Sequence, residues 1–467
     1  MKDTPTSTPQ SNTDSPVIDL SRRSFLKTAG AAGALSGVAI PHVFGQERSA
    51  VHVALIGCGG RGTGAAAQAL SVTAAPTKLV AMADVFQNRQ DESFRALERG
   101  FGNQKEKFDV PPERRFIGFE AYKEAMDCLR PGDIAIFTTP LAFRWVHFAY
   151  AIEKGLHVFM EKPLTADGPS SRKMIELAKK ADEKNLKVGV GLMVRHCRGR
   201  MELHDRIQNG EIGEIINMRS YRMHGPVASC FSKKKPDDIS ETMFQINRFH
   251  SFIWASGGLF NDFYIHFIDE TCWMKNKWPV KAQALGGRHY RGDFIDQNFD
   301  TYSVEYTFDD GTTLFFDGRT MLGCMDKQAS YVHGTKGSAI VSTAGHTPGK
   351  VRIFSGQRQH RDDLVWAFPQ PEPNPYQTEW DDLVTAIRDD TPYNEVERGV
   401  MASVVSNLGR FAAHTGQSVT LKEMLESDIA YAPDADKMTA DGPAPVVADA
   451  DGRYPVPEPG IKVDREY

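Results

Sequence analysis

Short apolar runs alternate with amphipathic stretches between residues 51 and 192. The run Val51 to Ile56 is mostly apolar and rich in β-branched residues, as expected of a strand buried on both faces. Similar runs at Ile134 to Thr138, His157 to Met160 and Lys187 to Gly191 predict further strands. Apolar residues at helical spacing lie between them, as at residues 145–152. This alternation predicts an α/β domain with a doubly wound parallel sheet.

The pattern changes after residue 192. Met201 to Asn209 has the spacing of an amphipathic helix, and from Ile215 to Arg222 apolar and polar residues alternate. Further strands are expected at Val280 to Tyr290, Thr301 to Phe308, Thr312 to Arg319, Ser330 to His333 and Ser338 to Ser342. Two helical patterns follow, around residues 380–387 and 400–408. We expect an α+β domain with a predominantly antiparallel open sheet, whose exposed face would suit a homo-oligomer interface.

A glycine cluster directly follows the first strand. Gly57, Gly59, Gly60 and Gly62 enclose Arg61, and an alanine-rich helical pattern begins at once. In the order strand, turn and helix, this G-x-G-x-x-G match predicts a Rossmann dinucleotide-binding domain. The first glycine permits the tight turn, the second lets the backbone approach a pyrophosphate, and the third lets helix and strand pack closely.

Asp84 ends the next predicted strand, Lys78 to Ala83. A carboxylate at this place in the motif is expected to bind the ribose hydroxyls of the adenosine. It would also repel a 2′-phosphate, so the sequence favours NAD over NADP as the cofactor.

The length of 467 residues predicts two domains with additional segments at the chain ends. We expect a disordered start with a signal peptide at 1–46, the nucleotide-binding domain at 49–192 and an α+β substrate and oligomerisation domain at 193–430. Residues 431–467 are rich in Pro, Asp and Ala and predict an extended or disordered tail.

The N-terminus has the composition of an export signal. Arg22 and Arg23 precede a mildly apolar run rich in Ala and Gly, from Thr28 to Ile40, with small residues near a plausible cleavage point. The paired arginines match a twin-arginine signal, which predicts export to the periplasm through that machinery in an already folded state. An exported nucleotide-dependent enzyme would load its cofactor before export and keep it.

Composition excludes several classes of partner. The formal net charge of -5 offers no basic surface for nucleic acid. No apolar run is long enough to span a bilayer. The six cysteines form no C-x-x-C pair, so no metal site is indicated.

Candidate catalytic groups lie at two places. Lys162 follows the predicted strand His157 to Met160, and ligands of open α/β sheets bind at such carboxyl ends. Asp262 and His266 are four residues apart and would share one face of a helix. An acid beside a histidine can fix its tautomer and raise its basicity. Taken alone, Lys162 would be interpreted as a solvated surface lysine, and Asp262 with His266 as a satisfied polar pair in a helix under a sheet.

With these pieces in order, the sequence resembles the glucose–fructose oxidoreductase / inositol dehydrogenase (Gfo/Idh/MocA) family from about residue 51 to 427. The resemblance rests on the glycine turn, on Thr138-Thr139-Pro140, on Glu161-Lys162-Pro163 and on the GG-x-x-x-D-x-x-x-H stretch from Gly257 to His266. It implies a catalytic Lys162 completed by Asp262 and His266. It also implies NAD or NADP bound at the turn, by Asp84, near Thr138 to Pro140 and at Glu161 and Lys162.

The substrate cannot be named from the resemblance. Residues 223–247 and 195–198, where substrate contacts would fall, match no substrate-defining pattern. Arg195, His196, His224 and Trp254 are candidates for contacts to sugar hydroxyls or rings, with a structural role as the alternative for each.

Three functions are compatible with these residues. The leading hypothesis is an oxidoreductase that moves a hydride between the nicotinamide and a sugar or cyclitol, while the proton passes to His266 and Lys162 stabilises the developing alkoxide. The second is an NAD-retaining enzyme that cleaves glycosides by transient oxidation and elimination. The third is a non-catalytic nucleotide-binding protein, which the presence of Lys162, Asp262 and His266 disfavours.

Overall fold

The computed structural model describes residues 50–289, 291–343 and 345–467, which belong to one compact unit. The expected disordered start and signal peptide at 1–46 lie outside the described residues. Among those that are described, no helix has both the length and the apolar character needed to cross a membrane.

The first domain is a six-stranded parallel sheet in the order β3-β2-β1-β4-β5-β6, which confirms the predicted Rossmann arrangement. Its strands are β1 Val51–Ile56, β2 Thr77–Asp84, β3 Arg115–Ile117, β4 Ile134–Phe137, β5 His157–Met160 and β6 Val188–Val190. The helices are α2 Gly60–Leu70, α3 Gln87–Phe101, α4 Ala121–Asp127, α5 Arg144–Glu153 and α6 Gly168–Glu183. Strands β4 and β5 are buried along their whole length, as their apolar runs predict.

The second domain contains a nine-stranded sheet in the order β14-β13-β12-β11-β7-β10-β9-β8-β15. Only the β7–β10 pair is parallel among these described strands, so the expected mostly antiparallel sheet is confirmed. The strands are β7 Ile215–His224, β8 Lys281–Gly287, β9 Thr301–Thr307, β10 Thr313–Thr320, β11 Lys327–Gly334, β12 Ser338–Ser342, β13 Arg352–Phe354, β14 Leu364–Ala367 and β15 Val419–Thr420. Strands β13 and β14 were not expected from the sequence.

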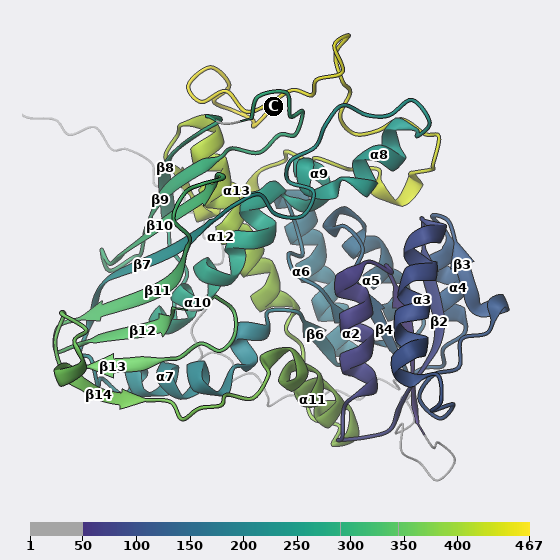
Figure 1. Cartoon of the computed structure of the whole chain (residues 1–467), viewed down its shortest axis with the longest axis horizontal. Coiled ribbons are helices and arrows are strands. Elements are labelled where there is room, and N and C mark those ends of the chain that lie inside the picture. The colour runs from purple at the N-terminus through teal and green to yellow at the C-terminus, as the bar shows by residue number, and fades with distance from the viewer. Residues whose placement is uncertain (1–49, 290, 344) are drawn as a thin grey trace, which may run out of the picture. The chain divides into compact units, whose positions relative to one another are not determined.

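Helices cover one face of this sheet. Helix α10 (Ile265–Lys275) packs on β7 and β11, and α12 (Val396–Thr415) packs on β8 and β9. Helix α7 (Arg198–Gln208) packs against α10 (Figure 1). On β9, Tyr302, Val304 and Tyr306 alternate with more exposed residues, and they form the buried face that their period of two predicts. The other face leaves apolar side chains such as Leu285 and Phe315 exposed.

Helix α11 (Pro375–Arg388) follows the strands of the second domain in sequence, but it packs on the parallel sheet of the first (Figure 1). The rings of Trp380 and Phe159 stack with centroids 4.4 Å apart. Leu383, Val384 and Ile387 belong to the same apolar cluster as β1 and α2. The chain therefore returns to complete the core of its nucleotide-binding domain.

Three short helical elements precede α10 in the sequence. They are α8 Glu241–Asn247, α9 Ile253–Ser256 and a π-helical turn, Phe260–Tyr264, which continues directly into α10. Residues 431–467 form an arm beside α8 and α9, seen in yellow in Figure 1. Gln245 donates to the carbonyl of Val446 at 2.6 Å, and the rings of Phe252 and Tyr454 meet edge to face.

The end of this arm enters the core. Glu466 is fully buried and accepts two hydrogen bonds from Arg410 of α12, at 2.8 and 2.9 Å. The same guanidinium donates to the carbonyls of Gly257 and Ala166, at 3.2 and 2.9 Å. Arg410 thus ties together the arm, the segment after β5 and the loop before the π-helical turn. The short helix α13 (Leu421–Glu426) precedes the arm.

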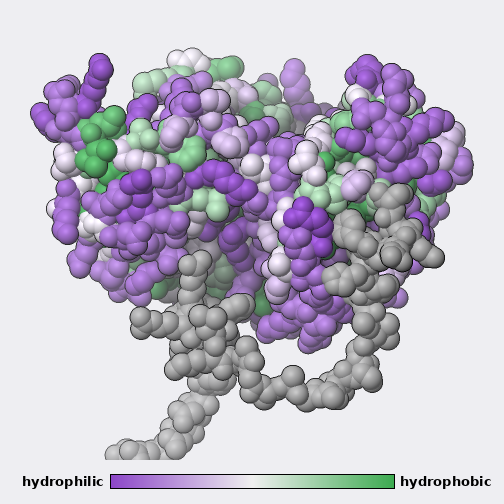
Figure 2. Space-filling view, turned by 90° about the horizontal axis from the view of Figure 1, so that it is seen from below, coloured by the Kyte–Doolittle hydropathy of each residue, from purple (hydrophilic) through white to green (hydrophobic). Residues whose placement is uncertain are grey.

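The surface seen from below is mostly hydrophilic, with hydrophobic residues in separate patches (Figure 2). The described residues that are visible in this view form no continuous apolar band.

Candidate active site

A cavity of about 640 Å³ opens at the carboxyl ends of β1, β4 and β5. Residues that follow these strands, including Gly57, Thr138 and Glu161, line one side of it. The second domain contributes the other side, through residues such as Asp262 and His266. Carboxyl strand ends and domain boundaries are the usual places for ligands in this architecture.

Two glycines in the turn after β1 allow the backbone to close tightly. Gly57 has φ +96°, and a Cβ on it would lie 2.8 Å from backbone atoms of Thr138 and Thr139. A Cβ on Gly62 would lie 2.1 Å from the carbonyl oxygen of Gly57. Larger side chains would force strand and helix apart, so both positions require glycine.

The same turn fits a dinucleotide. A Cβ built on Gly59 or Gly60 meets nothing within 4 Å, which leaves open space above the backbone. Helix α2 begins at Gly60, and its first N–H groups have no partner within the helix. Open space beside free N–H groups at a helix N-terminus suits the anionic pyrophosphate of a nicotinamide dinucleotide.

Asp84 lines the cavity at the end of β2. Its Oδ2 accepts a hydrogen bond from the backbone N–H of Cys58 at 2.6 Å, and its Oδ1 accepts one from Phe86 at 2.8 Å. Burial raises the pKa of Asp84, although these N–H groups and Arg89 act against the rise. The carboxylate is thereby held in place beside the turn.

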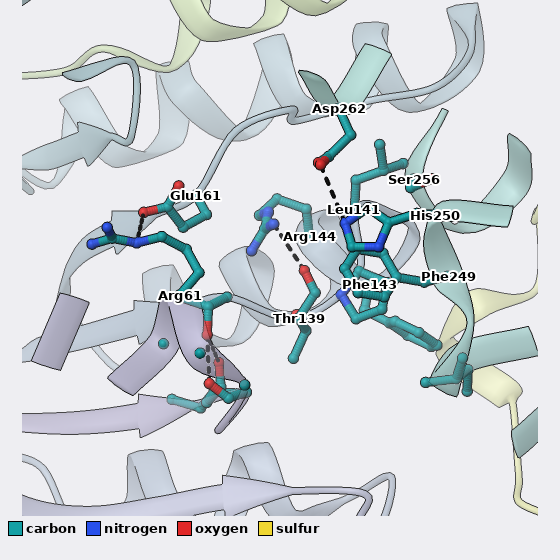
Figure 3. Close-up of a pocket in the computed structure, with 18 of the residues that line it drawn as sticks. Arg61, Thr139, Leu141, Phe143, Arg144, Glu161, Phe249, His250, Ser256 and Asp262 are labelled. Atoms are coloured by element: carbon teal, nitrogen blue, oxygen red, sulfur yellow. Dashed lines mark hydrogen bonds and ion pairs between the residues drawn. The ribbon is translucent and has the colours of Figure 1, made fainter. Parts of the chain in front are cut away.

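Every residue predicted to bind the cofactor lines this cavity. They are Gly57, Gly59, Gly60, Arg61, Gly62, Asp84, Thr138, Thr139, Pro140, Glu161 and Lys162. Arg61 Nε lies 2.9 Å from a carboxylate oxygen of the buried Glu161, and Arg144 donates to the carbonyl of Thr139 (Figure 3). The structure brings these residues together around one space.

Lys162, Asp262 and His250 form a chain of polar contacts. Lys162 Nζ donates to the backbone carbonyl of Asp262 at 2.7 Å and lies 3.5 Å from its Oδ1. His250 Nε2 lies 3.3 Å from the other carboxylate oxygen, Oδ2 (Figure 3). The opposite ring nitrogen, Nδ1, is 2.8 Å from the hydroxyl of Ser229. Burial works to raise the pKa of Asp262, but Lys162 and His250 outweigh it and lower that pKa to about 2. Asp262 is therefore an anion that positions the lysine.

His266 lines the same cavity without contacting Asp262. Its Nδ1 is buried and has no hydrogen-bond partner among the described residues, and its ring centroid lies 4.4 Å from that of His346. Burial, then His346 and Lys162, lower the pKa of His266 well below its usual value, so the ring is neutral. Asp262 lies in the π-helical turn and His266 in α10, and this break in α-helical geometry separates two residues that the spacing places together.

The four suggested substrate contacts lie outside the cavity lining. Arg195 forms a bidentate ion pair with Asp269, at 2.6 and 2.8 Å. The two ring nitrogens of His196 lie 2.8 Å from Asp382 and 3.2 Å from Glu395. These contacts occupy both side chains within the fold.

The other two differ from each other. His224 Nδ1 contacts the carbonyl of Gly225 at 2.6 Å, whereas its buried Nε2 has no hydrogen-bond partner among the described residues. Trp254 is buried in an apolar cluster and donates to Gln245 at 2.7 Å. Arg195, His196 and Trp254 are thus held by contacts within the fold, and none of the four suggested residues lines the cavity.

Sequence reasoning missed several polar residues that line the cavity, among them Arg222, His250, His346 and Tyr376. They come from β7, from the segment between α8 and α9, from the loop after β12 and from α11. No local motif marks them. The nearest signal was the lack of pattern over residues 223–247, which ends just before His250. Among the described residues, no group of three or more His, Cys, Asp or Glu side chains could hold a metal ion.

Comparison with known families gives the same two domains. Residues 51–192 match the oxidoreductase family with an NAD-binding Rossmann fold, and residues 201–340 match the GFO/IDH/MocA C-terminal domain. The chain belongs to the GFO/IDH/MocA family. Residues 19–39 match the signal sequence of the twin-arginine translocation pathway, which indicates export across the membrane.

The individual relatives are distant. An inositol 2-dehydrogenase of Corynebacterium glutamicum is 28% identical over 25% of this chain and 34% of its own. A D-glucoside 3-dehydrogenase of Escherichia coli is 26% identical over 40% of this chain and 49% of its own. The chain thus covers between a third and a half of these two relatives. The crystal structure of an aldose–aldose oxidoreductase from Caulobacter crescentus, in complex with glycerol, shares the fold, with TM-score 0.62, 16% identity, and coverage of 79% of this chain and 99% of that one.

Proposed function

We propose that this protein is an NAD-dependent oxidoreductase that transfers a hydride between the nicotinamide and a hydroxyl or ketone carbon of a sugar or cyclitol. The observation that carries the proposal is Lys162, held by Asp262 in the same cavity as a glycine turn that fits a dinucleotide. Family membership and relatives that oxidise inositol and glucosides support it.

Lys162, Asp262 and His266 each have a separate role in moving the substrate proton. Lys162 donates a hydrogen bond to the reacting substrate oxygen and stabilises the negative charge that develops on it. Asp262 fixes the lysine, and the neutral His266 accepts the substrate proton. The bound nicotinamide supplies the hydride acceptor. His250, joined to Asp262 from the other side, holds the carboxylate in position.

We assign NAD rather than NADP because of Asp84. Both its oxygens are fixed by backbone N–H groups at the edge of the cavity, where the ribose of the adenosine would lie. A fixed carboxylate there binds two hydroxyls and repels a phosphate.

We propose the periplasm as the site of action because of the twin-arginine signal. We propose a second copy of the chain as a partner, because the open face of the nine-stranded sheet leaves apolar side chains such as Leu285 and Phe315 exposed.

A second candidate function is the cleavage of glycosides by an enzyme that retains its NAD and shows no net redox change. The resemblance to a D-glucoside 3-dehydrogenase favours oxidation of a glycoside ring, and an exported enzyme has no supply of free nucleotide. A hydride would pass from a ring carbon to the retained NAD, and the glycosidic group would leave by elimination. Water would add to the resulting double bond, and the hydride would return from NADH to the carbonyl carbon, so the cycle has no net redox change. Cleavage of a glycoside without net formation of NADH would identify this function, and stoichiometric NADH would identify a conventional dehydrogenase.

Replacement of Lys162 by Met tests the proposal. We expect turnover to fall by about 10²–10⁴-fold, the usual contribution of a positioned proton donor, while nucleotide stays bound. The measurement is the initial rate of NADH formation across sugars and cyclitols, together with the nucleotide content of the denatured protein. Lys180→Met, at an exposed position on α6, is the matched control. A Lys162→Met protein with normal turnover would remove the lysine from the mechanism.

A further inference from the structure

Arg222 brings a positive charge to the cavity from strand β7 of the second domain. Its Nη1 donates to Gln328 Oε1 at 2.6 Å and approaches His346 Nε2 at 3.4 Å. The guanidinium lies over the ring of Phe267, with Cζ 5.4 Å from the centroid. Neutral groups therefore hold the side chain in place.

The Nε–Nη2 edge of this guanidinium has no acceptor among the described residues. Its Nε is buried without an acceptor, and no described residue accepts a hydrogen bond from Nη2. Within the described residues, Arg222 has no carboxylate within ion-pair distance. An arginine with an open Nε–Nη2 edge can bind a carboxylate through two parallel hydrogen bonds.

The carboxylates that line the cavity are already engaged. Six lysine and arginine side chains line it against three carboxylates, Asp84, Glu161 and Asp262. Glu161 pairs with Arg61 and Asp262 with Lys162, while Asp84 is bound by backbone N–H groups. The lining leaves Arg222 without a counter-ion, and a ligand can supply one.

Arg222 lies at the catalytic end of the cavity. It contacts His346, whose ring is 4.4 Å from that of His266. His346 Nδ1 lies 3.3 Å from the hydroxyl of Tyr376, and burial raises the pKa of Tyr376 to about 12, so that hydroxyl keeps its proton. The pyrophosphate position at Gly59 and Gly60 belongs to the first domain. A group bound by Arg222 is thus part of the substrate.

We infer that the substrate carries a carboxylate, as a uronic acid or another sugar acid does, and that Arg222 binds it. The inference rests on the proposed oxidoreductase function and narrows its substrate class. A phosphorylated sugar fits less well, because a phosphate dianion calls for more than one free cation.

Matched pairs of ligands test this inference. The probes are D-glucuronate with D-glucose, D-galacturonate with D-galactose, and D-glucose 6-phosphate. Binding to the NAD-loaded protein is measured by calorimetry, and NADH formation is followed in parallel. We expect at least one acid to bind about 10- to 100-fold more tightly than its neutral partner, the range for a charged hydrogen-bonded pair.

Variants connect the preference to one side chain. Arg222→Gln should bring the acid and neutral affinities together, and Arg222→Lys should keep part of the difference, since it retains charge and loses the paired geometry. Arg219→Gln is the control, because Arg219 is an exposed arginine on the same strand and does not line the cavity. It should keep the full preference.

Several outcomes would overturn the inference: equal or weaker binding of the acids, including no binding of any probe; a preference for the phosphate; or an acid preference that survives Arg222→Gln. Binding of an acid through Arg222 with no NADH formed and no ligand cleaved would support the carboxylate site and count against the oxidoreductase.

Discussion

The two ends of the cavity are built by different means. At the nucleotide end, backbone atoms of one continuous segment, from β1 through the glycine turn into α2, form the centre of the surface, with Asp84 and residues 138–140 beside it. At the catalytic end, side chains converge from segments as far apart in sequence as Lys162 and Tyr376. The geometry of the nucleotide end is set by the steric clearance of the backbone. The geometry of the catalytic end is set by side chains that converge from separate segments.

This difference predicts how each end responds to substitution. A turn that depends on backbone clearance should fail with the addition of one methyl group. An assembly of side chains should instead respond to charge and to proton affinity, with effects that depend on which charged group is removed. Three experiments test the contrast, from the largest expected effect to the smallest.

Gly62→Ala should weaken nucleotide binding most. The added methyl would lie 2.1 Å from the Gly57 carbonyl oxygen and 2.5 Å from the Thr138 hydroxyl, so strand and helix must move apart. A clash with backbone belongs at the upper end of the range for overpacking, about 3 kcal/mol or more, which lowers the affinity for NAD by more than about 100-fold if the strain is relieved at the turn. Calorimetric titration with NAD measures it.

Gly64→Ala is the control in the same helix, since its Cβ would meet only Arg61, at 3.7 Å. If both variants bound NAD as tightly as the unchanged protein, backbone clearance would not govern this end of the cavity.

Asp84→Ala should change the choice of cofactor. Loss of a charged acceptor costs about 1.5–3 kcal/mol in NAD affinity, and NADP binding should improve because the repulsion of its phosphate is gone. The ratio of the two dissociation constants is the measurement. Unchanged affinities for both nucleotides would show that the ribose is bound by other groups. Thermal unfolding of the variant controls for loss of the two backbone hydrogen bonds that Asp84 accepts.

The smallest expected effect is in the pH profile. His266 must be neutral to accept a proton, and activity is lost as pH falls through its pKa. Since burial, with His346 and Lys162, puts that pKa well below the usual value of about 6.5, kcat/KM should stay level down to about pH 6. An acid limb centred near pH 6.5 would contradict the neutral, buried state of His266.

The same contrast explains what sequence reasoning could and could not find. Strand β1, the turn and Asp84 are neighbours in sequence with fixed spacing, so local pattern and elementary sterics predict them. Lys162 was found because it follows a strand directly, at the edge where ligands bind. The alternating pattern of β9 predicted an open antiparallel sheet, although not the two strands at one end of it, β13 and β14, which are short.

Local sequence patterns could not predict contacts between segments that are far apart in the chain. Arg222 and His346 are 124 residues apart and meet only because β7 and the loop after β12 lie at one end of the sheet. The partner of Asp262 is His250 rather than His266, because a π-helical turn alters the spacing that an α-helix would impose. Arg195, His196, His224 and Trp254 resembled sugar-binding residues by type alone, and each has a partner within the fold.

The contact between Glu466 and Arg410 has a consequence for the order in which the fold is completed during synthesis. Arg410 reaches from Glu466 to the carbonyls of Ala166 and Gly257, which flank the segments that bear Lys162 and Asp262. The ribosome adds Glu466 after nearly all the residues described here, whereas the segment that matches the export signal, residues 19–39, emerges first. The segments that bear Lys162 and Asp262 therefore gain their contacts to Arg410 and Glu466 only once synthesis has reached residue 466.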